Sequence, residues 1–142
     1  MTGVQTCALP IYRVRTSFIQ GLPWARQRYR SLLPIFPFAI EGLDLDPYDL
    51  VVSSSHCVAK SVVVNPRARH ICYCHSPMRY AWDQFDAYFG ADRVGALKSR
   101  WVYRPILTRL ARWDAATAVR VHRFVANSEH VAARIQIGRA HV

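Results

Sequence analysis

The chain has 142 residues, of which 51% are hydrophobic, enough to bury one core. No window approaches the roughly 20 consecutive apolar residues of a membrane-spanning helix, so the composition excludes such a helix and favours a soluble single domain. The 19 Lys and Arg residues outnumber the 9 Asp and Glu residues and give a net charge of +10. This charge predicts attraction to anions such as sugar nucleotides, lipid phosphates, anionic membrane surfaces or nucleic acid, without choosing among them.

The cysteines and the chain ends bear on location and boundaries. The four cysteines have none of the regular spacing of a disulfide framework, so the sequence predicts a reducing, cytoplasmic location. Residues 1–11 (MTGVQTCALPI) and 137–142 (IGRAHV) resemble translated sequencing-adaptor sequence. We therefore expect one native domain over 12–136 with a non-native tail at each end; the alternative is a genuine short tail at each end.

The first predicted elements are two short helices. Residues 25–33 predict a short basic helix that ends before Pro34 and Pro37, because proline lacks an N–H and disfavours helix in the residue before it. Residues 36–45 predict a second short helix or an irregular segment. No repeat, low-complexity tract or Gly- and Ser-rich linker interrupts the chain, so a second domain is not expected.

Three compact apolar runs predict the strands of a sheet. They cover residues 49–55, 70–75 and 123–128. Continuous apolar runs of this kind are typical of parallel strands buried on both faces. The chain is therefore predicted to be an α/β protein with a Rossmann-like parallel sheet.

A long helical stretch separates the second and third strands. Residues 78–89 predict one helix, and residues 94–121 predict another that Pro105 kinks or divides. The second helix carries an unbalanced row of arginines: Arg100, Arg104, Arg109, Arg112 and Arg120. This row is compatible with peripheral docking on an anionic membrane or with a solvated charged face.

Polar side chains end each predicted strand. Ser55 ends the first strand, His75 ends the second and is followed by Ser76, and Ser128 ends the third. Ser76 precedes Pro77 in the order of an N-cap and a first helical residue, and Ser128 is placed to cap a helix over 129–135. Because carboxyl ends of parallel strands meet at one edge, the pattern predicts a crevice with N–H donors for phosphate or sugar hydroxyls. The alternative is that each serine only caps its helix.

A family resemblance is carried by four segments, LLPIFPFAIE (32–41), YDLVVSSSHCVAKSV (48–62), HICYCHSPMRYAWD (70–83) and FVANSEHVAARI (124–135). Together they resemble the amino-terminal domain of bacterial glycosyltransferase family 4 enzymes. The subgroup resembled contains mannosyltransferases and related enzymes of surface polysaccharide assembly. The likeness covers nearly all of the interior in the expected order.

The resemblance implies the GT-B architecture, in which two Rossmann-like domains face each other across a cleft. The amino-terminal domain handles the acceptor and the other holds a nucleotide sugar. The implied reaction moves a hexose such as mannose, with retention, to a glycan or a polyprenyl-diphosphate-linked acceptor, without a metal or other cofactor. The sequence would then be a truncated amino-terminal half, inactive alone, belonging to a cytoplasmic enzyme that contacts the inner face of the membrane peripherally.

The resemblance also assigns candidate site residues. It makes His75 the catalytic position, facing the transferred sugar and positioning a hydroxyl rather than acting as general base. The residues expected to bind substrate are Ser54, Ser55, His56, Ser76, Arg79, Trp82, Asp83, Asn127 and Ser128. Helical spacing would place Arg79, Trp82 and Asp83 on one side of the first turns as a cation, an aromatic platform and a carboxylate. The alternatives are a core position for Trp82 and an ion pair between Asp83 and Arg79.

The sequence also bears on three other function classes. His56, Cys57, Cys72, Cys74 and His75 carry zinc-ligand side chains, but Cys72 and Cys74 share a strand face opposite His75 and no C-x-x-C pair is present, so no metal is expected. The net charge fits a basic nucleic-acid-binding module, although no binding motif supports specific recognition. A non-catalytic acceptor-binding domain is the third possibility.

Overall fold

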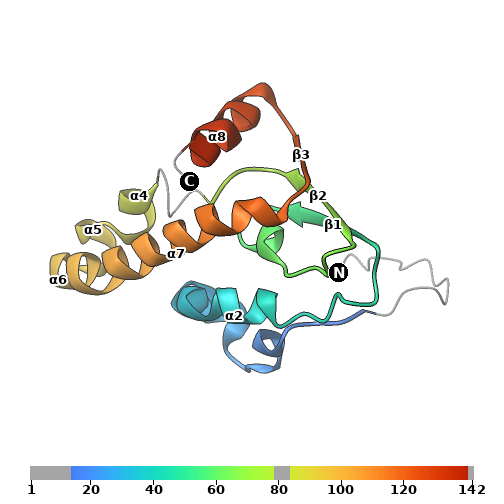
Figure 1. Ribbon diagram of the computed structural model, residues 1–142. Helices are drawn as coiled ribbons and strands as arrows, with labels where there is room; N and C mark the ends of the chain where they lie inside the picture. Colours follow the sequence, from blue (N-terminus) through green and yellow to red (C-terminus); the bar gives the residue numbers. More distant parts are fainter. Residues whose placement is uncertain (1–13, 79–83, 141–142) are drawn as a thin grey trace, which may run out of the picture.

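The computed structural model describes residues 14–78 and 84–140, and three short parallel strands lie at its centre (Figure 1). The strands are β1 (Leu50–Ser55), β2 (Arg69–Cys74) and β3 (Arg123–Ala126), in the order β1-β2-β3. Each lies close to its predicted bounds. The predicted α/β class and the parallel sheet are therefore confirmed.

The register aligns the carboxyl ends of the strands. Ser54 of β1 pairs with Tyr73 of β2, and Tyr73 pairs in turn with Val125 of β3. All three strands therefore end at the same edge of the sheet, as parallel pairing requires.

The two faces of the sheet differ in burial. On one face Cys72 and Cys74 are buried and pack with Val121 and with Val131 of helix α8 (Glu129–Ala140). The opposite face is open. Its exposed apolar side chains are Leu50, Val52, Tyr73 and Val125, with Val52 66% exposed. The prediction that the strands are buried on both faces is therefore wrong for the described part of the chain.

The N-terminal segment forms short helical pieces. They are η1 (Phe18–Gly21), α1 (Ala25–Arg28), η2 (Tyr29–Ile35) and α2 (Phe36–Glu41). The single helix predicted over 25–33 is wrong, because the chain changes from an α-helix to a 3₁₀-helix at Tyr29, and Pro34 lies inside that 3₁₀-helix. Pro37 lies in the first turn of α2, where its missing N–H has no intrahelical partner to lose.

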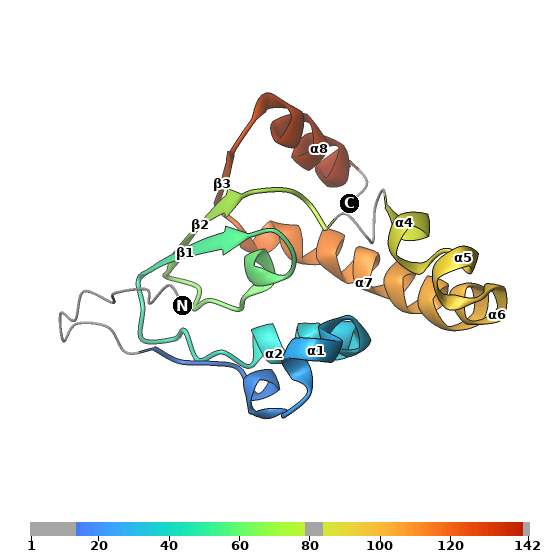
Figure 2. The same cartoon turned by 180° about the vertical axis from the view of Figure 1, so that it is seen from behind.

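The segment between β1 and β3 adds the remaining helices. A 3₁₀ turn, η3 (Ala59–Ser61), follows β1. After β2 come α4 (Phe85–Phe89), α5 (Ala91–Val94), α6 (Ala96–Lys98), the π-helical η4 (Ser99–Tyr103), α7 (Arg104–Ala116) and η5 (Thr117–Arg120). Figures 1 and 2 show α4 to α6 at the end of α7 that lies away from the sheet.

The helices predicted for this segment are shorter than expected. Met78 is not helical and α4 begins at Phe85, so the helix predicted over 78–89 is wrong at its start. The helix predicted over 94–121 begins at Ala96 and changes from π to α at Arg104. Pro105 then lies in the first turn of α7, where its missing N–H is tolerated.

A hydrophobic cluster ties the helices together. Leu33, Met78, Phe89, Leu107 and Leu110 are buried against one another and join η2, α4 and α7. None of the helices within 14–78 and 84–140 has both the length and the apolar character needed to cross a bilayer.

Candidate functional site

His75 lies at the carboxyl edge of the sheet, directly after β2, with an exposed side chain. Its backbone N–H donates to the carbonyl of Ser55 at 2.9 Å, so it continues the parallel pairing beyond β2. Side chains alternate along a strand, and the ring of Tyr73 accordingly lies beside that of His75. The two ring centroids are 5.0 Å apart, with the planes at 82°.

Ser54 brings a hydroxyl to the same ring. Its Oγ lies 2.8 Å from Nε2 of His75, and both side chains are exposed. Either group can donate in this hydrogen bond, according to which nitrogen of the imidazole carries the proton. The bond and the edge contact with Tyr73 together fix the direction in which the imidazole points.

The third strand contributes residues to the same edge. The backbone N–H of Asn127 donates to the carbonyl of Cys74 at 3.3 Å, which places Asn127 beside the end of β2. Asn127 and Ser128 are both exposed. The Ser128 hydroxyl accepts from the N–H of Val131 at 3.3 Å, so the predicted N-cap of α8 is confirmed.

Three other candidate residues have different surroundings. Ser55 is buried, and its hydroxyl accepts from the N–H of Lys60 and donates to the carbonyl of Cys57. Ser76 is only 9% exposed, and its hydroxyl donates to the carbonyl of Pro77 at 2.9 Å. His56 is exposed after the end of β1.

The predicted helix start at Ser76 and Pro77 is wrong, because residues 76–78 are not helical. The Ser76 hydroxyl donates to a carbonyl instead of accepting from the N–H of a first helical turn, so it does not act as an N-cap. Arg79, Trp82 and Asp83 lie outside the described residues.

Tyr73 is a candidate that sequence reasoning missed. It is 40% exposed, contacts the ring of His75, and is paired in register with Ser54. The two-residue periodicity of a strand could have identified it, since Tyr73 precedes His75 by two positions and shares its side of the sheet.

The cysteines of β2 carry thiols that do not ionise at neutral pH. Burial raises the pKa of the Cys72 thiol and raises that of Cys74 to about 11, so both remain neutral thiols near pH 7. Within the ranges that the structure describes, no three His, Cys, Asp or Glu side chains gather in a group able to hold a metal ion.

The edge combines an oriented imidazole, a hydroxyl, a phenol ring and an amide, contributed by His75, Ser54, Tyr73 and Asn127. Such groups donate and accept hydrogen bonds and offer an aromatic surface, which is the chemistry that recognises a polyhydroxylated ligand. A scan against protein-family models, a search of curated proteins and a search of solved structures each found no match to this chain.

Proposed function

We propose that the chain forms the acceptor-side half of a retaining glycosyltransferase of the GT-B kind. The intact enzyme moves a hexose such as mannose from a nucleotide sugar to a glycan or polyprenyl-diphosphate-linked acceptor. The observation that carries the proposal is the exposed pair of Ser54 and His75, 2.8 Å apart at the carboxyl edge of a parallel sheet. Ligands of open α/β sheets bind at that edge.

The contacts of His75 support a positioning role. Nε2 is engaged by Ser54, and no hydrogen bond of Nδ1 is found among the residues that the structure describes. A sugar hydroxyl can therefore bind Nδ1 while Ser54 holds the ring. Hydrogen bonds of this kind orient the transferred hexose without requiring the imidazole to remove a proton.

The neighbours of His75 extend the same surface. Tyr73 offers an exposed ring for the apolar face of a sugar, and the exposed Asn127 amide has two donors and an acceptor for hydroxyl groups. The net charge of +10 favours the approach of a diphosphate-bearing donor or acceptor, and of an anionic membrane surface, from the cytoplasmic side.

Sugar binding by the chain itself provides the first test. A titration with methyl α-mannoside, followed by NMR, should shift the ring signals of His75 and Tyr73. His75→Ala should weaken binding, whereas His130→Ala, a change to an exposed histidine on α8, should leave it unchanged. Equal binding by the wild-type chain and by both variants would refute a sugar site at His75.

Turnover provides the second test, in an enzyme that joins this chain to a nucleotide-sugar-binding half. His75→Ala should lower turnover by about 100-fold or more, the scale for losing one positioned group in a transition state. Sugar binding that depends on His75, combined with unchanged turnover, would identify a non-catalytic acceptor-binding role instead.

A further inference from the structure

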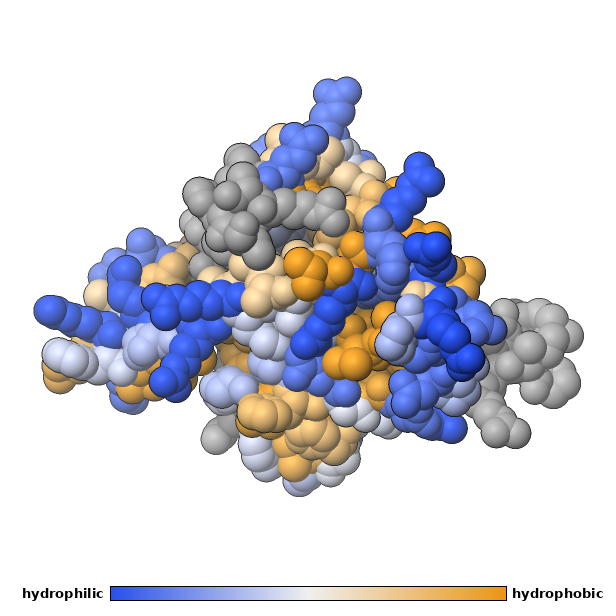
Figure 3. Space-filling model, in the orientation of Figure 1, coloured by the Kyte–Doolittle hydropathy of each residue, from blue (hydrophilic) through white to orange (hydrophobic). Residues whose placement is uncertain are grey.

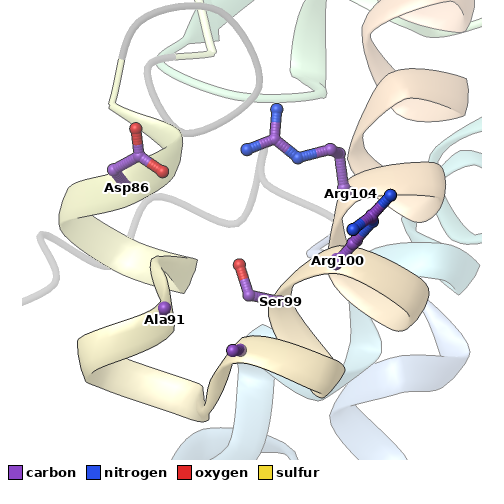
Figure 4. A pocket seen from close by; sticks show the side chains of 6 residues that line it. Asp86, Ala91, Ser99, Arg100 and Arg104 are labelled. Carbon is purple, nitrogen blue, oxygen red and sulfur yellow. The ribbon is translucent and has the colours of Figure 1, made fainter.

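A pocket of about 380 Å³ lies between α4, α5 and the start of the long helical segment that leads into α7 (Figure 4). Its lining residues are Asp86, Ala91, Ala96, Ser99, Arg100 and Arg104. The pocket shares no residue with the His75 edge and lies at the end of α7 away from the sheet (Figure 1). Its chemistry is therefore separate from the sugar site proposed above.

Glycine and alanine residues explain why this part of the chain is hollow. Gly90 lets α4 end and α5 begin at the next residue, and Gly95 has a φ of 87°, which favours glycine. Ala91 and Ala96 follow these two glycines and line the pocket with side chains of one carbon. The turn therefore leaves an open space that larger side chains would fill.

Ser99 presents a hydroxyl that has no assigned partner. The residue is only 7% exposed, and Figure 4 shows its oxygen pointing into the pocket. Its hydroxyl forms no hydrogen bond with any residue in the described part of the chain, although its backbone N–H donates to Gly95. The Ser99 hydroxyl is therefore able to donate a hydrogen bond to a molecule that enters the pocket.

Two arginines line the same pocket, four residues apart. Cζ of Arg104 lies 4.7 Å from the ring centroid of Phe85, and Figure 4 shows the side chain of Arg104 extending toward Asp86. Neither Arg100 nor Arg104 forms an ion pair with an acidic residue in the ranges 14–78 and 84–140. Cζ of Arg100 lies 5.5 Å from the ring centroid of Trp101, so this guanidinium adds positive charge beside the pocket. The guanidinium of Arg104 and the hydroxyl of Ser99 suit a tetrahedral phosphate, because guanidinium N–H groups match phosphate oxygens.

We propose that this pocket binds a hydroxylated phosphate ester. Ser99 and Arg104 donate hydrogen bonds to the phosphate oxygens, and Arg100 adds a second positive charge. Asp86, on the opposite wall, accepts a hydrogen bond from a hydroxyl of the same ligand. The carboxylate disfavours bare phosphate by charge repulsion and so selects for an ester that carries a hydroxyl group.

The surface beside the pocket bears on the source of the ester. Leu97 and Trp101 are 77% and 67% exposed, and Figure 3 shows hydrophilic side chains projecting beside apolar surface at this end of the molecule. A glycerol phosphate headgroup in a membrane and a free sugar phosphate or glycerol phosphate have the same phosphate and hydroxyl groups. Leu97 and Trp101 follow the pocket residues Ala96 and Arg100 in sequence, and exposed apolar side chains can contact the acyl region of a membrane lipid, a contact that the free ester lacks.

The test measures binding of glycerol 1-phosphate by calorimetry, and binding of phosphatidylglycerol vesicles by flotation with phosphatidylcholine vesicles as reference. Arg104→Gln should weaken binding by about tenfold, the loss expected for a charge-assisted hydrogen bond, and Arg100→Gln should weaken it less than Arg104→Gln does. Arg112→Gln removes the same charge from an exposed position on α7 outside the pocket, and should change affinity less than about twofold. Asp86→Asn should strengthen binding of inorganic phosphate and remove the preference for the ester.

Each outcome decides the proposal. Binding of free ester that Arg104→Gln abolishes supports the pocket with a small-molecule ligand, and binding of vesicles alone with the same sensitivity supports a lipid headgroup. Equal losses of affinity in Arg104→Gln and Arg112→Gln would show attraction to the net charge only and would overturn the proposed phosphate site. Absence of binding to both the free ester and the vesicles would overturn it as well. Thermal unfolding checks that each variant folds. If Arg104→Gln does not fold, Ser99→Ala takes its place in the comparison with Arg112→Gln.

Discussion

Nζ of Lys60 lies 3.0 Å from Oδ1 of Asp114, and the two side chains are 9% and 5% exposed. The ion pair joins η3 to α7 and so holds the segment after β1 against this long helix. Lys60 also donates to the backbone carbonyl of Asp114. Removing one member leaves the other as a buried charge without its counter-ion, which is far more costly than losing an exposed pair.

Asp114→Ala should therefore lower the free energy of unfolding by about 3–5 kcal/mol, as measured by urea denaturation. The matched control is Asp44→Ala, which removes the acid of the exposed pair between Arg15 and Asp44. That change should cost less than about 1 kcal/mol, because solvent screens an exposed pair. Similar costs for the two variants would contradict the role given to the buried pair.

His70 forms a second buried polar contact, at the amino end of β2. The ring is fully buried; Nε2 lies 2.8 Å from Oγ of Ser53, and Nδ1 lies 3.2 Å from the carbonyl oxygen of Arg120. The carbonyl can only accept, so Nδ1 carries the proton and Nε2 accepts from Ser53. Burial lowers the pKa of His70, the hydrogen bond to the Arg120 carbonyl raises it, and the electrostatic effects of His122 and Lys60 lower it, so that the pKa is below its ordinary value.

This lowered pKa predicts a loss of stability in acid. The unfolded chain binds a proton at His70 near the ordinary histidine pKa, whereas the folded chain binds it only at lower pH. The stabilising contribution of His70 is therefore complete above the pKa of this histidine in the unfolded chain, and it is lost as the pH falls through and below that value. The free energy of unfolding then decreases by at most about 1.4 kcal/mol per pH unit for one proton. Urea denaturation between pH 8 and pH 5 measures this slope.

His70→Gln should reduce that slope, because glutamine keeps hydrogen-bonding atoms without titrating. His130→Gln, at an exposed position on α8, should retain the wild-type slope. An unchanged slope in His70→Gln would assign the acid sensitivity to other groups. Glu41 does not counteract this loss of stability in acid. Burial raises the pKa of Glu41, but hydrogen bonds from Arg120 and Trp113 outweigh burial and leave that pKa below its ordinary value.

The strands and the cap of α8 were predictable because their signals are local. The apolar runs identify the strands, and Ser128 stands directly before the first helical residue. The open face of the sheet was not predictable, since burial of Val52 depends on which segments cover it rather than on its own strand. Apolar runs look alike whether one face or both are covered.

Part of the candidate site was predictable for the same reason. Ser54 lies one residue before the end of β1 and His75 directly follows β2, so parallel pairing brings them together. The cap expected at Ser76 failed, because the sequence shows that serine precedes proline but not that its hydroxyl donates to the Pro77 carbonyl. Lys60 and Asp114 are separated by 54 positions, and no local sequence pattern indicates that they form an ion pair.

Ser128 allows a direct test of the cap at the start of α8. Ser128→Ala removes the oxygen that accepts from the N–H of Val131 and should lower the free energy of unfolding by about 0.5–2 kcal/mol. Ser128→Asp keeps an acceptor and places a negative charge at the positive end of the helix dipole, so its stability should match or exceed that of wild type. Equal destabilisation by both variants, measured by urea denaturation, would show that the cap contributes nothing.

Gly90 tests the close approach that shapes the turn between α4 and α5. A Cβ at this position would lie 2.4 Å from the carbonyl oxygen of Asp86, closer than any van der Waals contact allows. The φ of −61° is accessible to alanine, so the penalty comes from the clash and not from the backbone conformation. Gly90→Ala should therefore lower the free energy of unfolding by about 1–3 kcal/mol, the usual cost of overpacking.

Gly21→Ala is the matched control, because a Cβ there would meet nothing within 4 Å. Without a clash, this substitution should be neutral or stabilising by about 0.4–1 kcal/mol through the reduced entropy of the unfolded chain. Thermal and urea unfolding of the two variants, side by side, separates the steric effect from the general effect of replacing glycine. Gly90→Ala unfolding with wild-type stability would mean that α4 and α5 separate without cost, and the pocket wall formed by Asp86 and Ala91 would then lack a fixed geometry.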